Sequence, residues 1–459
     1  MNKYQLSEIA KFVNGELHGN DIIVSNFSID SRTIKKDDVF ICIKGQKYDG
    51  HNFITDCIKK TSCLIISREI EDINLENKSY IKVNDTLKAL QDLSRFVRNK
   101  SKAKFIAITG SNGKTTVKEM IAHILSDYKI CYTKGNFNNH IGVPLTLLSM
   151  KQDEDYVIIE VGANNLGEIR PLANIVNPDV AAVTNIGYAH IEGFKCLDNT
   201  AKEKYSIFDS VKKDGFSVIY NQKEYRKFVK KGNKIFFGFE KGFNSKIKIK
   251  LKNLLYKTKF FYIKRINKEL YQLKDSSSEI KFKLSINGEH NYQNAACAAS
   301  VVSCFGFKLE DIATKLESFE GVVSRLKLHK LDKDIHLIDD SYNANPNSFK
   351  AAIEFLSSLD QKKLVLMGDM VELGSDTESF HSEIGEYAKT MGINQFLSIG
   401  KYSKFASKAF GVNGHHFNDT DSLKTYLNDN IAPSSRILIK GSRSARLEEY
   451  VDFLKARKF

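Results

Sequence analysis

The chain has 459 residues, of which 42% are hydrophobic, and carries a formal net charge of +14 at neutral pH. This length exceeds what one hydrophobic core usually serves, and at roughly 150 residues per domain it predicts about three domains. The N-terminus carries charges where a signal peptide needs an apolar run, and the most apolar later stretch, AACAASVVSCFGF, is too short to cross a bilayer. We therefore expect a globular cytoplasmic protein without a membrane span.

The seven cysteines include no C-x-x-C pair, which argues against a disulfide framework and against a zinc finger. The positive charge would suit nucleic-acid binding only if Lys and Arg were clustered. The densest basic run, SKIKIKLKN at 245–253, alternates Lys with Ile or Leu, as a strand with one solvated face does. We therefore expect no nucleic-acid partner, and a basic surface also suits an enzyme whose substrates carry phosphates and carboxylates.

The first hundred residues predict a small α/β domain. The stretch DDVFICIKG at 37–45 is typical of a strand entered from an acidic turn. TLKALQDLSRFVRNK at 86–100 has the apolar spacing of an amphipathic helix. We assign residues 1–100 to this first domain.

From residue 104 onward, apolar runs alternate with helical stretches, which predicts an α/β fold with a parallel, doubly wound sheet. The pattern restarts near residues 319–325. We therefore predict a central nucleotide-binding domain at 101–318 and a C-terminal Rossmann-like domain at 319–459. The predicted strands are FIAITG (105–110), YVIIEVGAN (156–164), VAAVTNIG (180–187), IHLIDD (335–340), KLVLMGD (363–369), QFLSIG (395–400) and RILIKGS (436–442).

The stretch FIAITGSNGKTTVKEMIAHIL at 105–125 predicts a strand, a Gly-rich loop and a helix, the order found in phosphate-binding loops. Glycines let backbone N–H groups approach a phosphate, the helix N-terminus favours the anion, and Lys114 adds a positive charge. The common pattern G-x-x-x-x-G-K-[ST] would need Gly where this chain has Ile108. A Gly-rich turn that binds nothing would leave Lys-Thr-Thr at the helix start unexplained. The predicted cradle comprises Gly110, Ser111, Asn112, Gly113, Lys114, Thr115 and Thr116.

Two further strands end in side chains that can bind a metal ion: Glu160 follows one, and His190 follows the next, near Asn185. Open α/β sheets build their sites at the carboxyl ends of strands. Alone, His190 would be an ordinary loop histidine and Lys204 a helix-surface lysine. Beside a phosphate loop, Glu160 and His190 instead predict metal ligands.

The order of several motifs identifies a family. The chain resembles the Mur ligases, which are ATP-dependent amide-bond-forming enzymes that assemble the peptide of bacterial cell-wall precursors. In this family the phosphate loop typically has the sequence pattern G-[ST]-N-G-K-T-T. The resemblance runs from Ser28 almost to the C-terminus. DSYNANP and GDMVELG are most similar to the family member that adds D-alanyl-D-alanine. The motifs are TGSNGKTT, TKGNFNNHIGVPLT, EVGANNLGEI, TNIGYAHIEGF, GEHNYQNAACA, DDSYNANP, GDMVELG and KGSR.

This resemblance implies ATP and two magnesium ions as cofactors. Thr115 and Glu160 would share one ion and His190 would hold the second. Lys204 corresponds to a lysine that these ligases commonly carry as a carbamate, whose carboxylate binds metal. Lys114, His190 and Lys204 are thus the expected catalytic residues.

The resemblance also implies contacts to the substrates. His290, Asn291 and Asn294 match a nucleotide-side motif, with Asn294 facing the adenine, and Arg325 and Asp340 match residues that reach the phosphates and ribose. Ser31 and Arg32 match the uridine-nucleotide site, and the Asn343 and Asn345 amides would suit a dipeptide better than a charged side chain. The expected substrate-binding residues are Ser31, Arg32, Asn138, Asn139, Thr184, Asn343 and Asn345.

Three departures from the family pattern bear on these roles. Ser324 stands where Gly usually precedes the arginine that is Arg325. Tyr205-Ser206 replaces a usual Gly-Glu, which leaves open whether Lys204 or Lys202 faces the site. VIYNQKE at 218–224 stands where Asn-x-Asp is common, so Gln222 weakens any role assigned there.

The expected activity is ATP-dependent addition of D-alanyl-D-alanine to UDP-N-acetylmuramoyl-tripeptide through an acyl phosphate, by a monomer. One alternative is another member of the superfamily, such as the diaminopimelate- or lysine-adding ligase or folylpolyglutamate synthase, with a different motif where DDSYNANP stands. A second alternative is a non-catalytic phosphate-loop regulator, which would need no second metal site.

Overall fold

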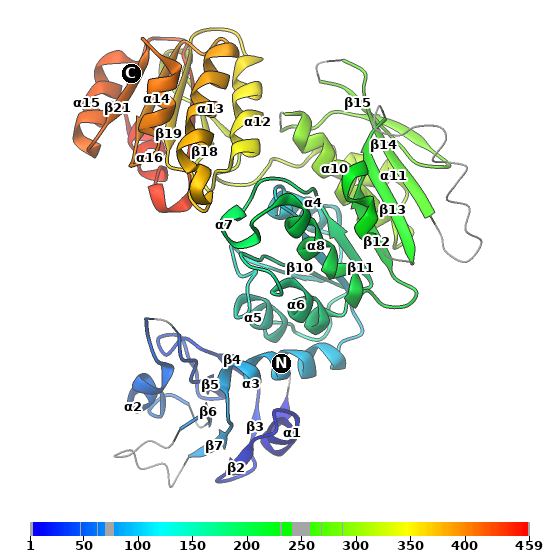
Figure 1. Cartoon of the computed structure of the whole chain (residues 1–459). Coiled ribbons are helices and arrows are strands. Elements are labelled where there is room, and N and C mark those ends of the chain that lie inside the picture. Colours follow the sequence, from blue (N-terminus) through cyan, green and yellow to red (C-terminus); the bar gives the residue numbers. More distant parts are fainter. Residues whose placement is uncertain are drawn as a thin grey trace.

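The computed structural model describes residues 3–45, 47–61, 63–68, 78–229, 232–240, 258–267, 269–286 and 288–457. Figure 1 shows three lobes in chain order, from the blue N-terminal lobe through the cyan and green centre to the orange and red C-terminal lobe. The basic strand predicted at 245–253 lies outside the described residues. Within them, no helix combines the length and hydropathy needed to cross a bilayer.

The N-terminal lobe contains a sheet with the strand order β2-β7-β6-β5-β4, in which only β2 runs antiparallel to its neighbour. The predicted strand and helix are both confirmed, as β5 and α3. Asp85 begins α3 by accepting hydrogen bonds from the N–H groups of Leu87 and Lys88, which caps the helix. The elements are β1 (Tyr4–Gln5), α1 (Leu6–Phe12), β2 (Glu16–His18), β3 (Ile23–Val24), β4 (Asn26–Ser28), β5 (Asp38–Ile41), η1 (Gly50–Phe53), α2 (Ile54–Cys57), β6 (Cys63–Ile66), β7 (Ser79–Lys82) and α3 (Thr86–Lys100).

The central lobe contains a sheet with the strand order β16-β15-β14-β13-β12-β11-β8-β10-β9. All neighbours from β9 to β14 are parallel, as predicted, but β14, β15 and β16 form an antiparallel extension that was not predicted. The elements are β8 (Lys104–Thr109), α4 (Lys114–Ile124), β9 (Ile130–Tyr132), α5 (Gly142–Leu148), β10 (Tyr156–Glu160), α6 (Ile169–Val176), β11 (Val180–Val183), α7 (Ile191–Phe194), α8 (Leu197–Tyr205), η2 (Ser206–Ser210), β12 (Phe216–Tyr220), η3 (Lys223–Phe228), β13 (Asn233–Phe239), β14 (Thr258–Arg265), β15 (Tyr271–Lys274), β16 (Glu279–Phe282), α10 (Glu289–Ser303) and α11 (Leu309–Glu317).

Helices cover both faces of the centre of this sheet, which explains why β8, β10 and β11 are almost wholly buried and apolar. Along β8, Ile106 and Ile108 enter a core shared with α4, α10 and α11. Phe105 and Ala107 point the other way, into a core shared with α5, α6 and α8. Ile108 is therefore a buried strand residue that precedes the phosphate loop.

The C-terminal lobe contains a sheet with the order β17-β18-β22-β19-β20-β21, parallel except for the pairing of β17 with β18. Its four predicted strands are confirmed as β18, β19, β20 and β22. The elements are β17 (Lys327–Lys330), η5 (Asp332–Asp334), β18 (His336–Asp340), α12 (Pro346–Ser357), β19 (Lys363–Gly368), η6 (Gly374–Asp376), α13 (Thr377–Thr390), β20 (Gln395–Ile399), α14 (Lys404–Phe410), β21 (Gly414–Phe417), α15 (Thr420–Asn430), β22 (Arg436–Lys440), η7 (Arg443–Ala445) and α16 (Glu448–Ala456).

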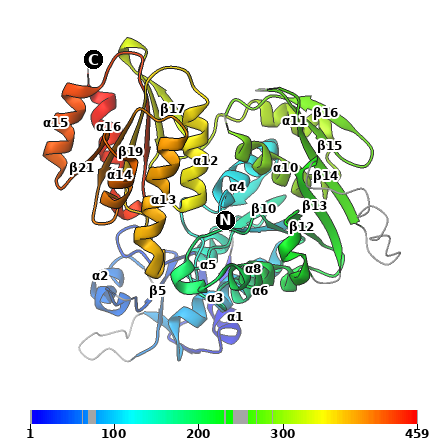
Figure 2. The same cartoon turned by 45° about the horizontal axis from the view of Figure 1, so that its top comes forward.

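The third lobe lies alongside the central one in both views, with α12 and α13 on the side that faces it (Figures 1 and 2). Residues of the loops after β8, β10, β11 and β18 line one cavity. This edge of the parallel sheets is where ligand sites form in open α/β folds.

Candidate active site

The predicted phosphate loop connects β8 to α4. Gly110 and Gly113 have φ of 150° and 81°, a region that favours glycine. A Cβ at Gly110 would lie 1.9 Å from the Thr184 hydroxyl, and one at Gly113 would lie 2.3 Å from the Asn294 amide oxygen. The loop therefore needs both glycines, for conformation and for space. Asn294, expected beside the adenine, packs against the loop itself.

A second loop, after β11, holds the phosphate loop in place. The Ser111 hydroxyl donates to the Gly187 carbonyl at 2.9 Å and accepts from the Gly187 N–H at 2.9 Å. The Asn112 N–H donates to Asn185 Oδ1 at 3.0 Å, and the Thr184 hydroxyl donates to the Asn112 carbonyl at 2.5 Å. Thr184 is 1% exposed. Its placement supports the loop and offers a substrate almost no surface.

Gln222 clamps the same second loop. Its amide oxygen accepts from the Ile186 N–H at 2.8 Å, and its amide nitrogen donates to the Ile186 carbonyl at 2.9 Å. The residue that departs from the family pattern thus has a structural role in this chain.

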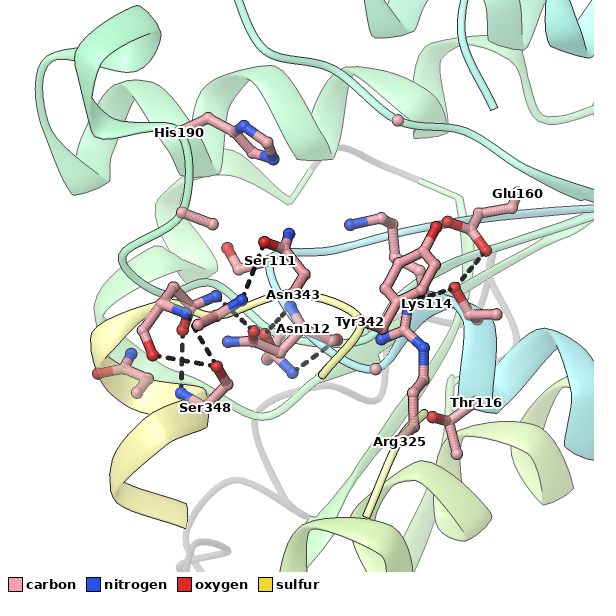
Figure 3. A pocket seen from close by; sticks show the side chains of 18 of the residues that line it. Ser111, Asn112, Lys114, Thr116, Glu160, His190, Arg325, Tyr342, Asn343 and Ser348 are labelled. Carbon is pink, nitrogen blue, oxygen red and sulfur yellow. Dashed lines mark hydrogen bonds between the residues drawn. The ribbon is translucent and has the colours of Figure 1, made fainter. Parts of the chain in front are cut away.

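Glu160 is the centre of the polar contacts on the other side of the loop (Figure 3). It is 2% exposed and accepts from the Thr115 hydroxyl at 2.9 Å and from the Asn138 amide at 2.8 Å. Arg325, which comes from the C-terminal lobe, donates to Thr115 Oγ1 at 3.0 Å and stacks over the Tyr342 ring at 4.3 Å. The structure thus brings together four predicted residues from two lobes.

Two lysines lie behind this cluster. Lys114 donates to the Gly110 carbonyl at 2.9 Å, and burial in the cleft lowers its pKa despite the nearby Glu160 carboxylate. Lys204 is 1% exposed, and burial, followed by the positive charge of Lys114, lowers its pKa well below the ordinary value. Its ammonium lies 5.3 Å from the Phe194 ring centroid. Lys202, on the same helix, is exposed, so it is Lys204 that faces inward.

His190 lies on the opposite side of the pocket from Glu160 and Lys114 in Figure 3. Its Nδ1 contacts the carboxylate of Glu372, which the C-terminal lobe supplies. The close approach of the His190 imidazole is the main cause that lowers the pKa of Glu372. Among the described residues, no three His, Cys, Asp or Glu side chains gather as a metal site.

Asp340 is the last residue of β18 and Asn343 lies in the loop after it, and a buried lysine holds both. Lys440 donates to Asp340 Oδ2 at 2.5 Å and to the Asn343 carbonyl at 2.9 Å. Burial raises the pKa of Asp340, and the Lys440 charge opposes that rise. Burial also lowers the pKa of His290, beside Lys440, to about 4. Asp340 lines the cavity and already has a counter-ion, Lys440.

Asn345 links the two lobes. Its side-chain oxygen accepts from the Ser348 N–H at 2.9 Å and caps α12, while its amide nitrogen donates to Asn112 Oδ1 at 2.6 Å. Both polar atoms are thus used within the chain. The Asn139 side-chain oxygen is likewise used within the chain, just before α5, where it accepts from the Ile141 N–H at 3.1 Å and from the Gly142 N–H at 2.9 Å.

Ser31 and Arg32 lie on the N-terminal lobe, outside the lining of the cavity that borders the phosphate loop. Arg32 has an 86% exposed side chain, and its guanidinium pairs with Asp30 at 2.7 Å. The Ser31 carbonyl accepts from Lys60 at 2.9 Å. The two residues are available to a ligand that extends across this lobe.

Ser324 keeps the turn that glycine usually makes. Its φ is 58°, in the left-handed region, and its hydroxyl donates to Asp339 Oδ2 at 3.2 Å. The local side-chain hydrogen bond offsets part of the cost of a Cβ in this conformation.

A cavity of about 790 Å³ joins these groups. Most of the predicted residues line it. Sequence reasoning missed Tyr342, Glu372 and Lys440 as members, although all three follow or belong to the quoted motifs DDSYNANP, GDMVELG and KGSR. The predicted residues that line the cavity are Ser111, Asn112, Gly113, Lys114, Thr115, Thr116, Asn138, Asn139, Glu160, His190, His290, Asn291, Asn294, Arg325, Asp340, Asn343 and Asn345.

Three family models match consecutive parts of the chain: "Mur ligase family, catalytic domain" at 23–98, "Mur ligase middle domain" at 108–302 and "Mur ligase, glutamate ligase domain" at 324–443. The chain belongs to the Mur ligase family. The resemblance seen in the sequence and the predicted three-domain α/β fold class are thereby confirmed. The exact domain boundaries stay a prediction.

Among Mur ligases, the chain is 36% identical to the UDP-N-acetylmuramoyl-tripeptide–D-alanyl-D-alanine ligase of Escherichia coli, with 97% of each chain covered. It is 32% identical to the Bacillus subtilis protein of the same name, with 98% of each covered. A crystal structure of MurF from Acinetobacter baumannii has a TM-score of 0.89 and 28% identity, with 100% of each chain covered. A folylpolyglutamate synthase from Mycobacterium tuberculosis, at 15% identity and TM-score 0.59, shares the fold alone.

Proposed function

We propose that this chain is an ATP-dependent ligase that joins D-alanyl-D-alanine to UDP-N-acetylmuramoyl-tripeptide. The observation that carries the proposal is the closed cluster in which Arg325 of the C-terminal lobe reaches Thr115 of the phosphate loop, beside buried Glu160. A cationic side chain is thereby held where a phosphoryl group on this loop would develop charge. Full-length similarity to ligases of this specificity supports the choice of substrates.

The reaction proceeds in two steps. A carboxylate oxygen of the tripeptide attacks the γ-phosphorus of ATP, the bond to the bridging oxygen breaks, and ADP leaves with an acyl phosphate formed. The amine of D-alanyl-D-alanine then attacks the acyl carbon, phosphate leaves, and the nitrogen loses one proton. Positioning and charge neutralisation account for the catalysis, with no protein nucleophile.

The residues near the loop fit magnesium, which prefers oxygen ligands. Glu160 and Thr115 would hold one ion and His190 a second, and the ions would neutralise charge on the transferring phosphoryl group. Unmodified Lys204 does not fit, because it is a cation. Its lowered pKa favours the neutral amine, the form that reacts with CO2. A carbamate would give this buried side chain a carboxylate, behind the residues that line the cavity.

The three lobes divide the substrates. Ser31 and Arg32 on the N-terminal lobe (1–100) would bind the uridine nucleotide, and the central lobe (101–318) ATP. The C-terminal lobe (319–459) would close over ATP and present the amine. The available contact would be the amide nitrogen of Asn343, for which the described part of the chain shows no hydrogen bond, rather than that of Asn345. We propose that the protein acts as a monomer in the cytoplasm.

The test is phosphate release measured over a matrix of UDP-muramoyl peptides and amine donors. With UDP-muramoyl-tripeptide and ATP, phosphate and product should appear in equal amounts for D-alanyl-D-alanine, and barely at all for D-alanine, L-lysine or diaminopimelate. A site whose polar groups are left unpaired by the wrong substrate discriminates strongly. Turnover of UDP-muramoyl-dipeptide with a free diamino acid instead would assign the chain to an earlier step.

A further inference from the structure

Arg325 lies in a segment of uncommon backbone conformation between the central and C-terminal lobes. Ser324 has φ of 58° and Leu326 has φ of 52°, so both neighbours of Arg325 lie in the left-handed region. That region disfavours residues that carry a Cβ, and it persists only where surrounding contacts determine it. The arginine that reaches Thr115 of the phosphate loop is therefore held by a strained backbone that needs anchors.

The C-terminal lobe supplies these anchors from the end of β18 and the loop after it. The Leu326 N–H donates to Asp340 Oδ1 at 3.2 Å. The Tyr342 N–H donates to the Ser324 carbonyl at 3.2 Å. The Tyr342 ring also lies against the Arg325 guanidinium (Figure 3). Asp340 and Tyr342 thus fix the backbone on either side of Arg325 and the direction of its side chain.

Lys440, the last residue of β22, holds these anchors from the buried side. Its side chain is 2% exposed, and it donates to Asp340 Oδ2 at 2.5 Å and to the Asn343 carbonyl at 2.9 Å. Asp340 therefore uses one carboxylate oxygen for Lys440 and the other for the Leu326 N–H. Without the lysine, this carboxylate would lose its counter-ion in a mostly buried position and would no longer be held against Leu326.

We propose that Lys440 is a positioning residue that holds Arg325 against the phosphate loop through Asp340 and the loop after β18. This inference rests on the proposed function, in which Arg325 contacts the phosphates of ATP. Lys440 itself offers a nucleotide little, because its ammonium is buried and already bonded within the chain. A guanidinium that is already held in place loses less conformational freedom when a phosphate binds, so a residue behind it raises the affinity.

The experiment is a double-mutant cycle on the affinity of the full-length protein for the non-hydrolysable ATP analogue AMPPCP, measured by isothermal titration calorimetry. Arg325→Ala should weaken binding about 10- to 100-fold, because a hydrogen bond to a charged group is lost. Lys440→Met alone should weaken it about 3- to 30-fold, as expected for residues coupled in one network. In the Arg325→Ala background, Lys440→Met should weaken it by less than about twofold more, because the group through which it acts is gone.

Arg436→Met is the matched control. Arg436 lies at the other end of β22, its side chain is 11% exposed, and it pairs with Asp334 at 3.1 Å. Its loss removes a buried cation from the same strand, away from Arg325, and should leave AMPPCP affinity within about twofold. Circular dichroism shows whether each variant is folded, and Lys440→Gln, which keeps a donor, takes the place of Lys440→Met if the latter is unfolded.

Three results would overturn the proposal: an equal loss of affinity in the Arg436 variant, no loss in the Lys440 variant, or an undiminished loss from Lys440 in the Arg325→Ala background. Ligation of D-alanyl-D-alanine by the unmodified enzyme tests the proposed function separately. Binding of AMPPCP without coupling between Lys440 and Arg325 would overturn this inference alone, whereas an unmodified protein that binds no AMPPCP would overturn both.

Discussion

Thr115→Val is the sharpest test of the phosphate-loop assignment, because valine keeps the shape of threonine and removes only its hydroxyl. That hydroxyl donates to the Glu160 carboxylate at 2.9 Å and accepts from the Arg325 guanidinium at 3.0 Å. A hydrogen bond to a charged group contributes about 1.5–3 kcal/mol. Glu160 keeps its bond from Asn138 and Arg325 keeps its stacking on Tyr342. We therefore expect a loss of stability of only about 1–2 kcal/mol.

The loss of activity should be larger than this. If Thr115 binds the metal that neutralises the transferring phosphoryl group, removing its oxygen should cost about 3–4 kcal/mol, or at least about a hundredfold in kcat. Phosphate release measures turnover, and circular dichroism measures the melting temperature, which should fall by about 2–8 °C. Thr115→Ser restores the oxygen and should recover most of the activity. A folded Thr115→Val enzyme with near-normal turnover would refute the assignment.

The remaining predictions concern two buried lysines. Lys204→Ala should be inactive and partly rescued by short carboxylic acids, whereas exposed Lys202→Ala should be mild; an active, metal-loaded enzyme whose intact mass shows no carbamate would contradict this. Because the folded-state pKa of Lys204 lies below its unfolded value, the folded chain binds fewer protons there and stability from this group rises with pH. In bicarbonate-free buffer, Lys204→Met should therefore be more stable than the parent near pH 7, with the difference in urea midpoint shrinking toward pH 10. Lys118 is fully buried and donates to the Thr133 carbonyl at 2.6 Å. Lys118→Met should therefore lower the free energy of unfolding by about 1–3 kcal/mol. An unchanged urea midpoint would show that another group satisfies this carbonyl.

Local patterns in the sequence predict the elements of the fold that are buried on both sides. The run that ends at Ile108 could be predicted as a strand because every residue in it is apolar, whichever face it meets. The antiparallel extension of the central sheet could not be predicted so easily. Two of its strands, β15 (Tyr271–Lys274) and β16 (Glu279–Phe282), have four residues each and are partly exposed, so their apolar signal is weak.

Residues of the candidate site could be predicted from the sequence where their placement depends only on their own loop. Gly110 and Lys114 are examples, because the loop and the following helix are continuous in sequence. The roles of Asn345 and Glu372 depend on contacts with residues of another lobe that are far away in the sequence. No local sequence pattern encodes such a partner. Lys204 could be distinguished from Lys202 only once the helix phase was known.

The hydrogen bond between Asn112 and Asn345 has a consequence for how the enzyme responds to ionic strength. Both amides are neutral, so added salt screens nothing between them, and no proton is gained or lost at either group in the physiological pH range. The contact between His190 and Glu372, in contrast, involves a carboxylate at a partly exposed position. When the imidazole is protonated, rising salt should therefore loosen the His190 end of the seam between the lobes, while the phosphate loop stays attached to α12.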